Sequence, residues 1–370
     1  MRQIIVLKQK IIQEITEPRR VSHGHVLHEL VDILVIALCT ILCGGESFAD
    51  MEDFGRYRYD WLKTFLHLPN GIPDSDTFRR CLERICPKEL SRCLYDWLGQ
   101  YRKERGVLAI DGKTIRGSAN ADHKAYHVLS CFATEFRITL GEVAVDEKSN
   151  EITAVPELLD LLDVSGSIVT ADAMSCQKSI VQKITEKRAD YVIGLKGNQK
   201  TLHEDVRLYM DSYRDEVPVF EEESKGHGRK ERRIYRLLTD IQWLEQRDEW
   251  SGLSAVGEVE RIITQKGTTR TEMSYYITSL TAREEFSRAV RNHWKIENNL
   301  HWSLDVLFRE DDCRAKKDNS PKNLNVLRKV ALGMLETTSI QKKSKRRKKF
   351  IAALDHSVME HMLLGTAEIQ

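Results

Sequence analysis

The chain has 370 residues, of which 41% are hydrophobic and 31% charged, so it is long enough for two or three domains with a real core. Its 57 lysines and arginines almost balance 56 aspartates and glutamates, and a net charge of +1 excludes a chain that attracts nucleic acid through its overall charge. Eight cysteines without a Cys-x2-Cys pair argue against a zinc site.

The first 104 residues are predicted to form a helical N-terminal domain. Its most apolar helix, over 28–43, contains Asp32 and is too short to span a bilayer, and Met1–Lys10 shows no signal peptide. We therefore expect a cytoplasmic protein. Farther along, a short capped helix over 77–85 follows a tight turn. Packing is the preferred interpretation of that helix, with DNA or partner contact as the second one.

The pattern changes at residue 107, where short strands begin to alternate with helices. The strand-like runs are 107–110, 125–134, 137–145, 167–172 and 191–195, and a helix follows each of the last three. This is the element order of the ribonuclease H-like fold. We expect residues 105–217 to be the first part of such a core, an α/β fold with a mixed five-stranded sheet and helices. In that fold the first and fourth strands lie side by side.

Two of these strands end on a carboxylate, Asp111 after the first strand and Asp172 after the fourth. The two side chains are therefore expected to be neighbours. Lys113 and Arg116 follow Asp111 closely, and a carboxylate at the end of a buried strand beside basic groups is a common metal or phosphate site in α/β folds. An isolated Asp-Gly pair is better explained as a turn, so a role for Asp111 depends on its partners.

Residues 218–282 are predicted to form a β-rich insertion, because apolar and polar residues alternate there at period two. The insertion contains a basic stretch over 227–233, which includes Arg229. This stretch is able to face DNA, and a charged hairpin loop explains it equally well.

A long helix is predicted over residues 283–308. At the helical period, one of its faces carries Val290, His293, Trp294, Glu297, His301 and Leu304. A carboxylate in such a stripe is costly to bury without compensation. For a lone Glu297, a hydrogen bond or ion pair with His293 or His301 is the simpler explanation. A metal ion shared with Asp111 and Asp172 is the alternative.

The end of the chain is predicted to contain one more core element and a tail. A helix over 324–335 closes the core, so that residues 283–340 complete it, and 341–370 form a basic C-terminal tail. Seven of the nine residues 341–349 are basic. Contact with phosphates and a solvated surface explain this run equally well.

Several motifs occur in an order that resembles a known family. They are residues 108–117 around Asp111, 146–157, 170–177 around Asp172, the Lys-Gly-Asn-Gln motif that ends at Gln199, 291–306 around Glu297, and 310–312. Together with residues 38–44 and 65–78, they resemble the H-repeat-associated proteins of Rhs elements and their insertion-sequence transposase relatives. The resemblance covers almost the whole chain, and the ordered set is far more specific than any single motif.

This resemblance implies a DDE transposase with a ribonuclease H-like core and a β insertion before the catalytic helix. Asp111 and Asp172 match the two aspartates of the family and Glu297 matches its glutamate, so these three are the expected catalytic residues and metal ligands. Related transposases carry Tyr, Arg and Lys where this chain has Val290, His293 and Leu304. The cation that contacts the DNA backbone is therefore open, and the candidates for DNA contact are Lys113, Arg116, Lys196, Arg229, His293 and His301.

The chemistry explains why such residues are needed. Two Mg²⁺ ions about 3.5–4 Å apart can activate the attacking oxygen and stabilise the leaving one. We expect Asp111 to bridge both ions and Asp172 and Glu297 to complete one each, with Mn²⁺ able to replace Mg²⁺. Without metal, three crowded carboxylates raise one another's pKa, and this repulsion gives affinity for a cation.

The expected substrates are double-stranded DNA with the element's terminal inverted repeats, and target DNA for strand transfer. We expect a homo-oligomer in the synaptic complex, in the bacterial cytoplasm and on the nucleoid when bound to DNA. The alternatives are a ribonuclease H-like nuclease that cuts without joining and a non-mobile relic that binds DNA without catalysis.

Overall fold

The computed structural model describes residues 2–19, 26–120, 123–145, 151–226, 228–338, 340 and 343–364. Residues 146–150 of the motif 146–157, His227 in the basic stretch 227–233, and the first two residues of the run 341–349 lie outside the described residues. The chain divides into two compact units. The first contains residues 1–103, 113–144 and 297–370, and the second contains 104–112 and 145–296.

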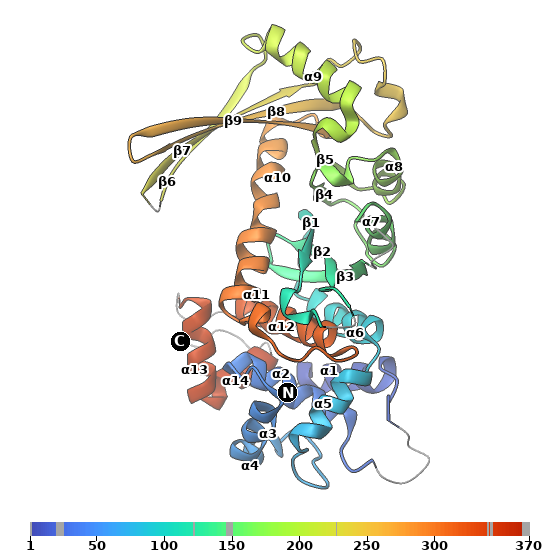
Figure 1. The fold of residues 1–370 in the computed structure, drawn as a ribbon, viewed down its shortest axis with the longest axis vertical. Helices are drawn as coiled ribbons and strands as arrows, with labels where there is room; N and C mark the ends of the chain where they lie inside the picture. The colour runs from blue at the N-terminus through green and yellow to red at the C-terminus, as the bar shows by residue number, and fades with distance from the viewer. Residues whose placement is uncertain are drawn as a thin grey trace. The chain divides into compact units, whose positions relative to one another are not determined.

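The first unit is mainly helical (Figure 1). Its helices are α1 (Arg2–Glu14), α2 (Leu30–Cys43), α3 (Phe48–Tyr57), α4 (Tyr59–Leu62), α5 (Ser75–Arg84), α6 (Pro87–Gly99), α11 (Trp302–Val306), α12 (Ser320–Thr337), α13 (Lys345–Leu354) and α14 (His356–Leu364). Helix α12 packs against α2, α5 and α6, and both α2 and α12 are buried along most of their length. The predicted apolar helix over 28–43 is thus confirmed as the buried helix α2.

The apolar helix α2 is the part of the first unit that most resembles a membrane span. Within the described residues, no single helix is long and apolar enough to cross a membrane. Only α2 and α3 taken together reach the required length and composition, and the chain bends by 96° between them.

The first unit also contains a strand pair and two short turns of 3-10 helix. Strands β2 (His127–Ala133) and β3 (Ile138–Val145) are neighbours, as the predicted hairpin requires. Arg137 in the connecting turn has a φ of 57°, and its amide donates to the carbonyl of Ala133 at 2.7 Å. The turns η2 (Arg116–Ser118) and η7 (Glu310–Asp312) pack against each other.

The second unit contains a mixed sheet with the strand order β1-β4-β5-β9-β8-β7-β6. These strands are β1 (Val107–Thr114), β4 (Ile168–Ala171), β5 (Asp190–Leu195), β6 (Val219–Gly226), β7 (Arg229–Leu238), β8 (Ala255–Gln265) and β9 (Thr268–Thr278). Strands β1, β4 and β5 run parallel, and each later pair is antiparallel. The helices are α7 (Glu151–Asp160), α8 (Lys178–Glu186), α9 (Lys200–Tyr213) and α10 (Arg283–Lys295).

The pairing of these strands confirms one prediction and leaves another unconfirmed. The first and fourth strands are indeed adjacent, because Val107 pairs with Ile168 and Ile110 with Ala171. A five-stranded core sheet is not confirmed. Strand β9 pairs with β5 from Val192↔Thr278 to Leu195↔Tyr275, so the strands of 218–282 extend the sheet. The edge of β5 would otherwise present unpaired backbone groups, and β9 covers them.

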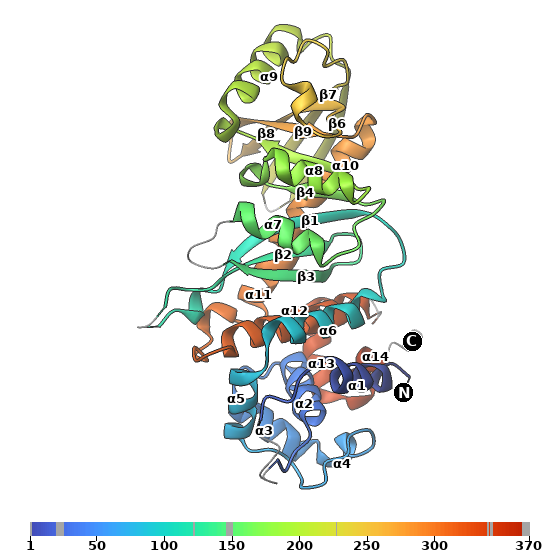
Figure 2. The same cartoon turned by 90° about the vertical axis from the view of Figure 1, so that its right-hand side faces the viewer.

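Helices α9 and α10 cover opposite sides of the antiparallel strands (Figures 1 and 2). Two neighbouring residues of β9 show this directly: the ring of Tyr275 contacts His203 of α9, and the ring of Tyr276 contacts Phe286 of α10. Phe286 and Val290 of α10 belong to one buried cluster with apolar side chains of β1, β4, β5, β7 and β8. This packing fixes α10 on the sheet whose strand β4 is followed by Asp172.

Candidate functional site

Asp111 and Asp172 lie at the same edge of the parallel part of the sheet. Strands β1 and β4 are paired up to Ile110↔Ala171, and the next residue of each chain segment is an aspartate. The prediction that the first strand ends before Asp111 is wrong, because β1 continues to Thr114 and only its pairing with β4 stops at Ile110. Parallel strands place their carboxyl ends together, which is where α/β folds place ligand sites. Both aspartates are half-buried. The expected neighbourhood of the two carboxylates thus follows directly from the strand register.

The carboxylate of Asp172 is held by the turn that it begins. Asp172 caps the short helix η3 (Ala173–Ser175), and its Oδ1 accepts from the amides of Met174 at 3.0 Å and Ser175 at 3.4 Å. Burial, followed by the charge of Glu151, raises the pKa of Asp172, although both amides and Lys196 act in the opposite direction. The ionised carboxylate is therefore less favourable in this half-buried position than it would be in water.

The donor atoms at this edge fit a divalent cation. Asp111 and Asp172 offer hard carboxylate oxygens, and the pKa of Asp172 is raised by burial and, after it, by the charge of Glu151, both of which a bound cation would offset. Within the described residues, no three His, Cys, Asp or Glu side chains gather closely enough to hold a metal ion. The aspartate pair therefore needs a further ligand, such as water, substrate or another carboxylate.

Glu297 lies in a different kind of helix from the one predicted. The helix over 283–308 is interrupted, because α10 ends at Lys295 and a π-helical turn, η6 (Ile296–His301), precedes α11. A π turn contains more residues than an α turn and so rotates the following side chains. Glu297 is exposed, while Ile296 and Leu300 are buried. The prediction that Glu297 is buried in an apolar stripe is therefore wrong.

The exposure of Glu297 bears on its function. An exposed carboxylate needs no compensating partner, and π turns occur frequently at functional sites. Glu297 belongs to the first unit, and Asp111 and Asp172 belong to the second. A metal site shared by the three thus stays a prediction.

The two histidines of this helix are poorly suited to contact phosphate as cations. The Nδ1 of His293 lies 3.0 Å from the Thr170 hydroxyl on β4, and burial lowers the pKa of His293 to about 4. His293 is consequently neutral near pH 7. His301 is buried and has little surface to offer DNA. Their predicted contacts with DNA stay untested, and the location of each argues against them.

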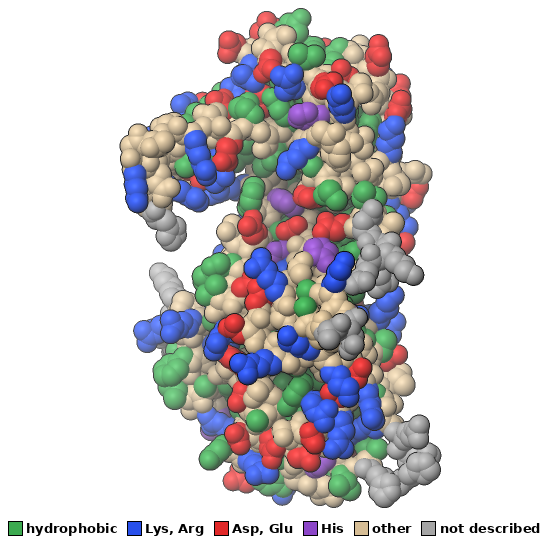
Figure 3. All heavy atoms as spheres, viewed as in Figure 1, with side chains coloured by type: hydrophobic (Ala, Val, Ile, Leu, Met, Phe, Trp, Pro, Cys, Tyr) green, Lys and Arg blue, Asp and Glu red, His purple; other side chains and the backbone are tan. Residues whose placement is uncertain are grey.

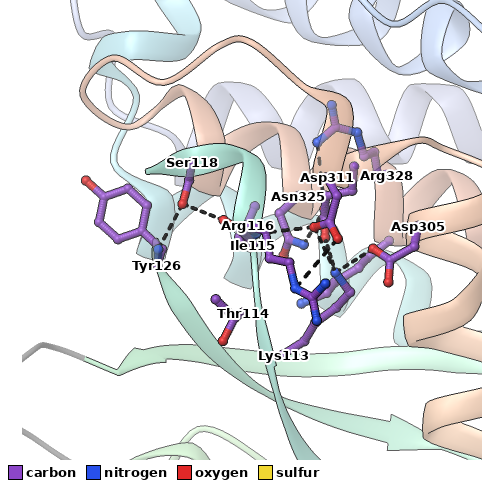
Figure 4. Close-up of polar contacts among 12 residues, drawn as sticks. Lys113, Thr114, Ile115, Arg116, Ser118, Tyr126, Asp305, Asp311, Asn325 and Arg328 are labelled. Atoms are coloured by element: carbon purple, nitrogen blue, oxygen red, sulfur yellow. Dashed lines mark hydrogen bonds and ion pairs between the residues drawn. The ribbon is translucent and has the colours of Figure 1, made fainter. Parts of the chain in front are cut away.

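Lys113 is engaged in a buried ionic cluster of the first unit (Figure 4). Its Nζ lies 2.7 Å from Asp305 and 3.1 Å from Glu310, and its side chain is only 10% exposed. Glu310 has no exposed surface, and its second oxygen accepts from Asn325 at 2.7 Å and lies 3.7 Å from Arg328. Burial alone would raise the pKa of Glu310, but Arg328 and Lys113 lower it overall. Lys113 therefore has a structural role in this cluster, and its predicted contact with DNA stays untested.

Arg116 has a side chain that remains available at the surface. Its guanidinium is 82% exposed and lies 4.0 Å from Asp311, while its backbone amide donates to the same carboxylate at 3.2 Å. Gly117 fixes this loop by close approach, since a Cβ there would lie 2.8 Å from the carbonyl oxygen of Asp311. The loop is thus rigidly attached at its backbone while the arginine faces solvent.

Lys196 and Arg229, the other cationic candidates, belong to the second unit and are exposed. Arg229 lies 3.6 Å from Glu231, a weak surface pair. Over the face drawn in Figure 3, lysines and arginines are interspersed with acidic side chains, which agrees with the nearly neutral composition. Individual exposed cations such as Lys196 and Arg229 are therefore the candidates for phosphate contact in the second unit.

Sequence reasoning missed several residues. Glu151 lies in the motif 146–157, but nothing in the sequence indicated that its charge raises the pKa of Asp172. Trp294 and Trp302 flank Glu297 and are 47% and 55% exposed. Large exposed aromatic rings are unusual and suit contact with bases. The aromatic character of this helix was visible, but its exposure was not.

Two family descriptions match the chain. Residues 9–98 match "DDE_Tnp_1-associated", and residues 102–334 match "Transposase DDE domain". The chain belongs to the DDE transposase family. It is thus a transposase, an enzyme that cleaves DNA, and the resemblance found in its motifs is confirmed.

Two curated relatives extend over almost the whole transposase. The "H repeat-associated putative transposase YhhI" of Escherichia coli (strain K12) is 38% identical over 354 residues, which are 92% of this chain and 93% of that relative. YbfL of the same strain is 37% identical, with the same coverage. Among solved structures, a piggyBac transposase synaptic complex with hairpin DNA gives a TM-score of 0.43 at 13% identity, over 100% of this chain and 83% of that one. That likeness is too weak to assign a fold.

Proposed function

We propose that this transposase cuts DNA at the inverted ends of its own insertion element and joins the freed 3′ ends to target DNA. Asp111, Asp172 and Glu297 are its metal ligands, on a ribonuclease H-like core. The observation that carries this proposal is the parallel pairing of β1 and β4, after which both strands continue into an aspartate. Membership of the DDE family supports it.

The chain's own residues prepare this site before any cation binds. The Met174 and Ser175 amides hold one oxygen of Asp172, so the direction of the carboxylate is fixed. When bound, two Mg²⁺ ions activate the attacking oxygen and stabilise the leaving one, and Mn²⁺ can replace them. Asp111 and Asp172 supply oxygens of the kind that both ions prefer.

The assignment of Glu297 as the third ligand is supported by the helix before it. His293 is hydrogen-bonded to Thr170, two residues before Asp172 on β4. Glu297 follows His293 by four residues, about one helical turn farther along. Neutral His293 thus holds the helix against the strand without adding positive charge next to the ligands.

DNA contact is assigned to exposed residues. Arg116, Lys196 and Arg229 provide cations for phosphates, and exposed Trp302 provides a ring on which an unpaired base at the cut site can stack. The partners are double-stranded DNA with terminal inverted repeats, target DNA and a second copy of the chain in the synaptic complex. The proposed location is the bacterial cytoplasm, on the nucleoid when bound to DNA.

A nicking and strand-transfer assay with the element's own ends tests the proposal. We expect Mg²⁺-dependent nicks at the ends and joined products with the wild type. Asp111→Asn, Asp172→Asn and Glu297→Gln should each reduce nicking by more than about 100-fold while DNA binding is retained. Asp248→Asn, at an exposed carboxylate of a surface pair, is the matched control. Nicks without joined product would indicate a nuclease, and binding without nicks would indicate a relic.

A further inference from the structure

The Lys-Gly-Asn-Gln motif after β5 carries two side-chain amides directed at one turn. Both belong to the short helix η4 (Gly197–Gln199). The Nδ2 of Asn198 donates to the carbonyl oxygen of Ala173 at 2.7 Å, and the Nε2 of Gln199 donates to that of Cys176 at 2.9 Å. Both acceptors lie within four residues of Asp172, so the motif contacts the turn that the aspartate begins.

The backbone hydrogen bonds within this turn are local, and two of them join groups three residues apart. The amide of Ser175 donates to the carbonyl of Asp172 at 3.2 Å, and the amide of Cys176 donates to that of Ala173 at 3.1 Å. A single 3-10 turn is weakly stable by itself, because it fixes several dihedral angles for very few bonds. Nevertheless, Ala173, Ser175 and Cys176 are all buried. The Asp172 carboxylate and the backbone amide of Gln177 add local bonds. Asn198 and Gln199 instead bind the turn to the segment after β5.

The same segment supports the turn from a second direction. A Cβ at Gly194 of β5 would lie 3.1 Å from the amide nitrogen of Ala173 and 3.5 Å from the carbonyl carbon of Asp172. Strand β5 thus lies in close contact with the backbone that carries the carboxylate. Gly194 and Asn198 thus contact the beginning of the turn, and Gln199 contacts its end.

We propose that Asn198 and Gln199 are positioning residues that hold the turn 173–176, so that the Asp172 carboxylate keeps the direction in which it binds a divalent cation. The inference rests on the proposed function, in which Asp172 is a metal ligand. Neutral amides are suited to this role because they donate hydrogen bonds without adding charge beside the carboxylate. Groups behind a metal ligand commonly change metal affinity by 10–100-fold when they are removed.

The experiment compares Asn198→Ala and Gln199→Ala with Gln182→Ala in the full-length protein. Gln182 is the matched control, because its amide makes a local surface bond to Glu186 on α8. The first readout is the rate at which Cys176 reacts with a thiol reagent, resolved by peptide mass. Cys176 is buried, and loosening the turn by one hydrogen bond should raise its reaction rate about tenfold. The second readout is the Mn²⁺ concentration that gives half-maximal nicking.

We expect both readouts to rise about tenfold in Asn198→Ala and Gln199→Ala and to stay at wild-type values in Gln182→Ala. Faster labelling of Cys176 with an unchanged Mn²⁺ requirement would leave the amides a purely structural role and overturn the inference. Unchanged labelling would show that the amides do not hold the turn, with the same consequence. Asp172→Asn separates the two proposals. If Asp172→Asn nicks normally, the proposed function fails. If Asp172→Asn is inactive while Asn198→Ala and Gln199→Ala behave like Gln182→Ala, the inference alone fails.

Discussion

The chain segments that follow Asp111 and Asp172 are held in opposite ways: strand β1 continues to Thr114 after Asp111, whereas a short 3-10 turn begins after Asp172. After Asp111, the chain is held by charge, because Lys113 enters a buried cluster with Asp305 and Glu310. After Asp172, the chain is held by the neutral amides of Asn198 and Gln199. A buried ionic cluster is costly to disturb and sensitive to pH, whereas amide bonds are individually weak and independent of pH. The comparison predicts different responses to mutation.

The largest expected effect comes from the ionic cluster. Glu310→Leu leaves Lys113 and Arg328 buried without their main partner, and loss of one member of a buried ion pair costs about 3–5 kcal/mol. Urea denaturation of the full chain measures this loss. Gln199→Ala should cost only about 1 kcal/mol by the same measurement. Equal losses of stability in Glu310→Leu and Gln199→Ala would contradict this difference between the two segments.

The next effect is a dependence of stability on pH at His293. Its pKa falls from 6.5 to about 4 on folding, so the unfolded chain takes up the proton first as the pH decreases. Stability is therefore fully present above pH 6.5 and declines down to about pH 4, by roughly 3 kcal/mol. His293→Asn keeps a donor for Thr170 and should remove this slope. Urea midpoints at pH 5 and pH 7 measure it, and an unchanged slope in the variant would count against a neutral His293.

Glu310 adds a second pH effect in a lower window. Its pKa is lowered in the folded chain, so its contribution is present above the unfolded value near 4.3 and is lost as the pH falls through the folded value. The wild type should therefore lose stability below about pH 4.3. Glu310→Gln should be less stable at pH 7 and show a smaller loss on acidification, as followed by circular dichroism. An equal acid loss in both proteins would exclude Glu310 as its source.

The smallest effect distinguishes the two lysines beside the aspartates. Lys196 is exposed, and Lys196→Ala should reduce the slope of log Kd for DNA against log salt concentration by about 1. Lys113→Met, measured at a temperature where the variant is folded, should leave that slope unchanged because its charge is already paired. A reduced slope in Lys113→Met would restore this residue as a phosphate contact.

Local sequence patterns were sufficient for the aspartates and insufficient for their surroundings. Asp111 and Asp172 end short apolar runs in a recognisable order of elements, so their adjacency follows from topology. The partners of Lys113 are Asp305 and Glu310, nearly 200 positions away, and no local pattern connects them. Glu297 was predicted to be buried because an uninterrupted α-helix would place it on the apolar face. The π turn that exposes it has no periodic signature in the sequence. Likewise, no pattern in the sequence of β9 predicts that it pairs with β5.

The central claim is that Asp111, Asp172 and Glu297 bind the same divalent cations. Iron-directed cleavage tests it most directly, because Fe²⁺ with ascorbate cuts a polypeptide close to the bound ion. We expect cuts near all three residues in the full-length protein, suppressed together by excess Mg²⁺ and absent in Asp172→Asn. Cuts near the aspartates without one near Glu297, or cleavage that Mg²⁺ does not suppress, would contradict the account.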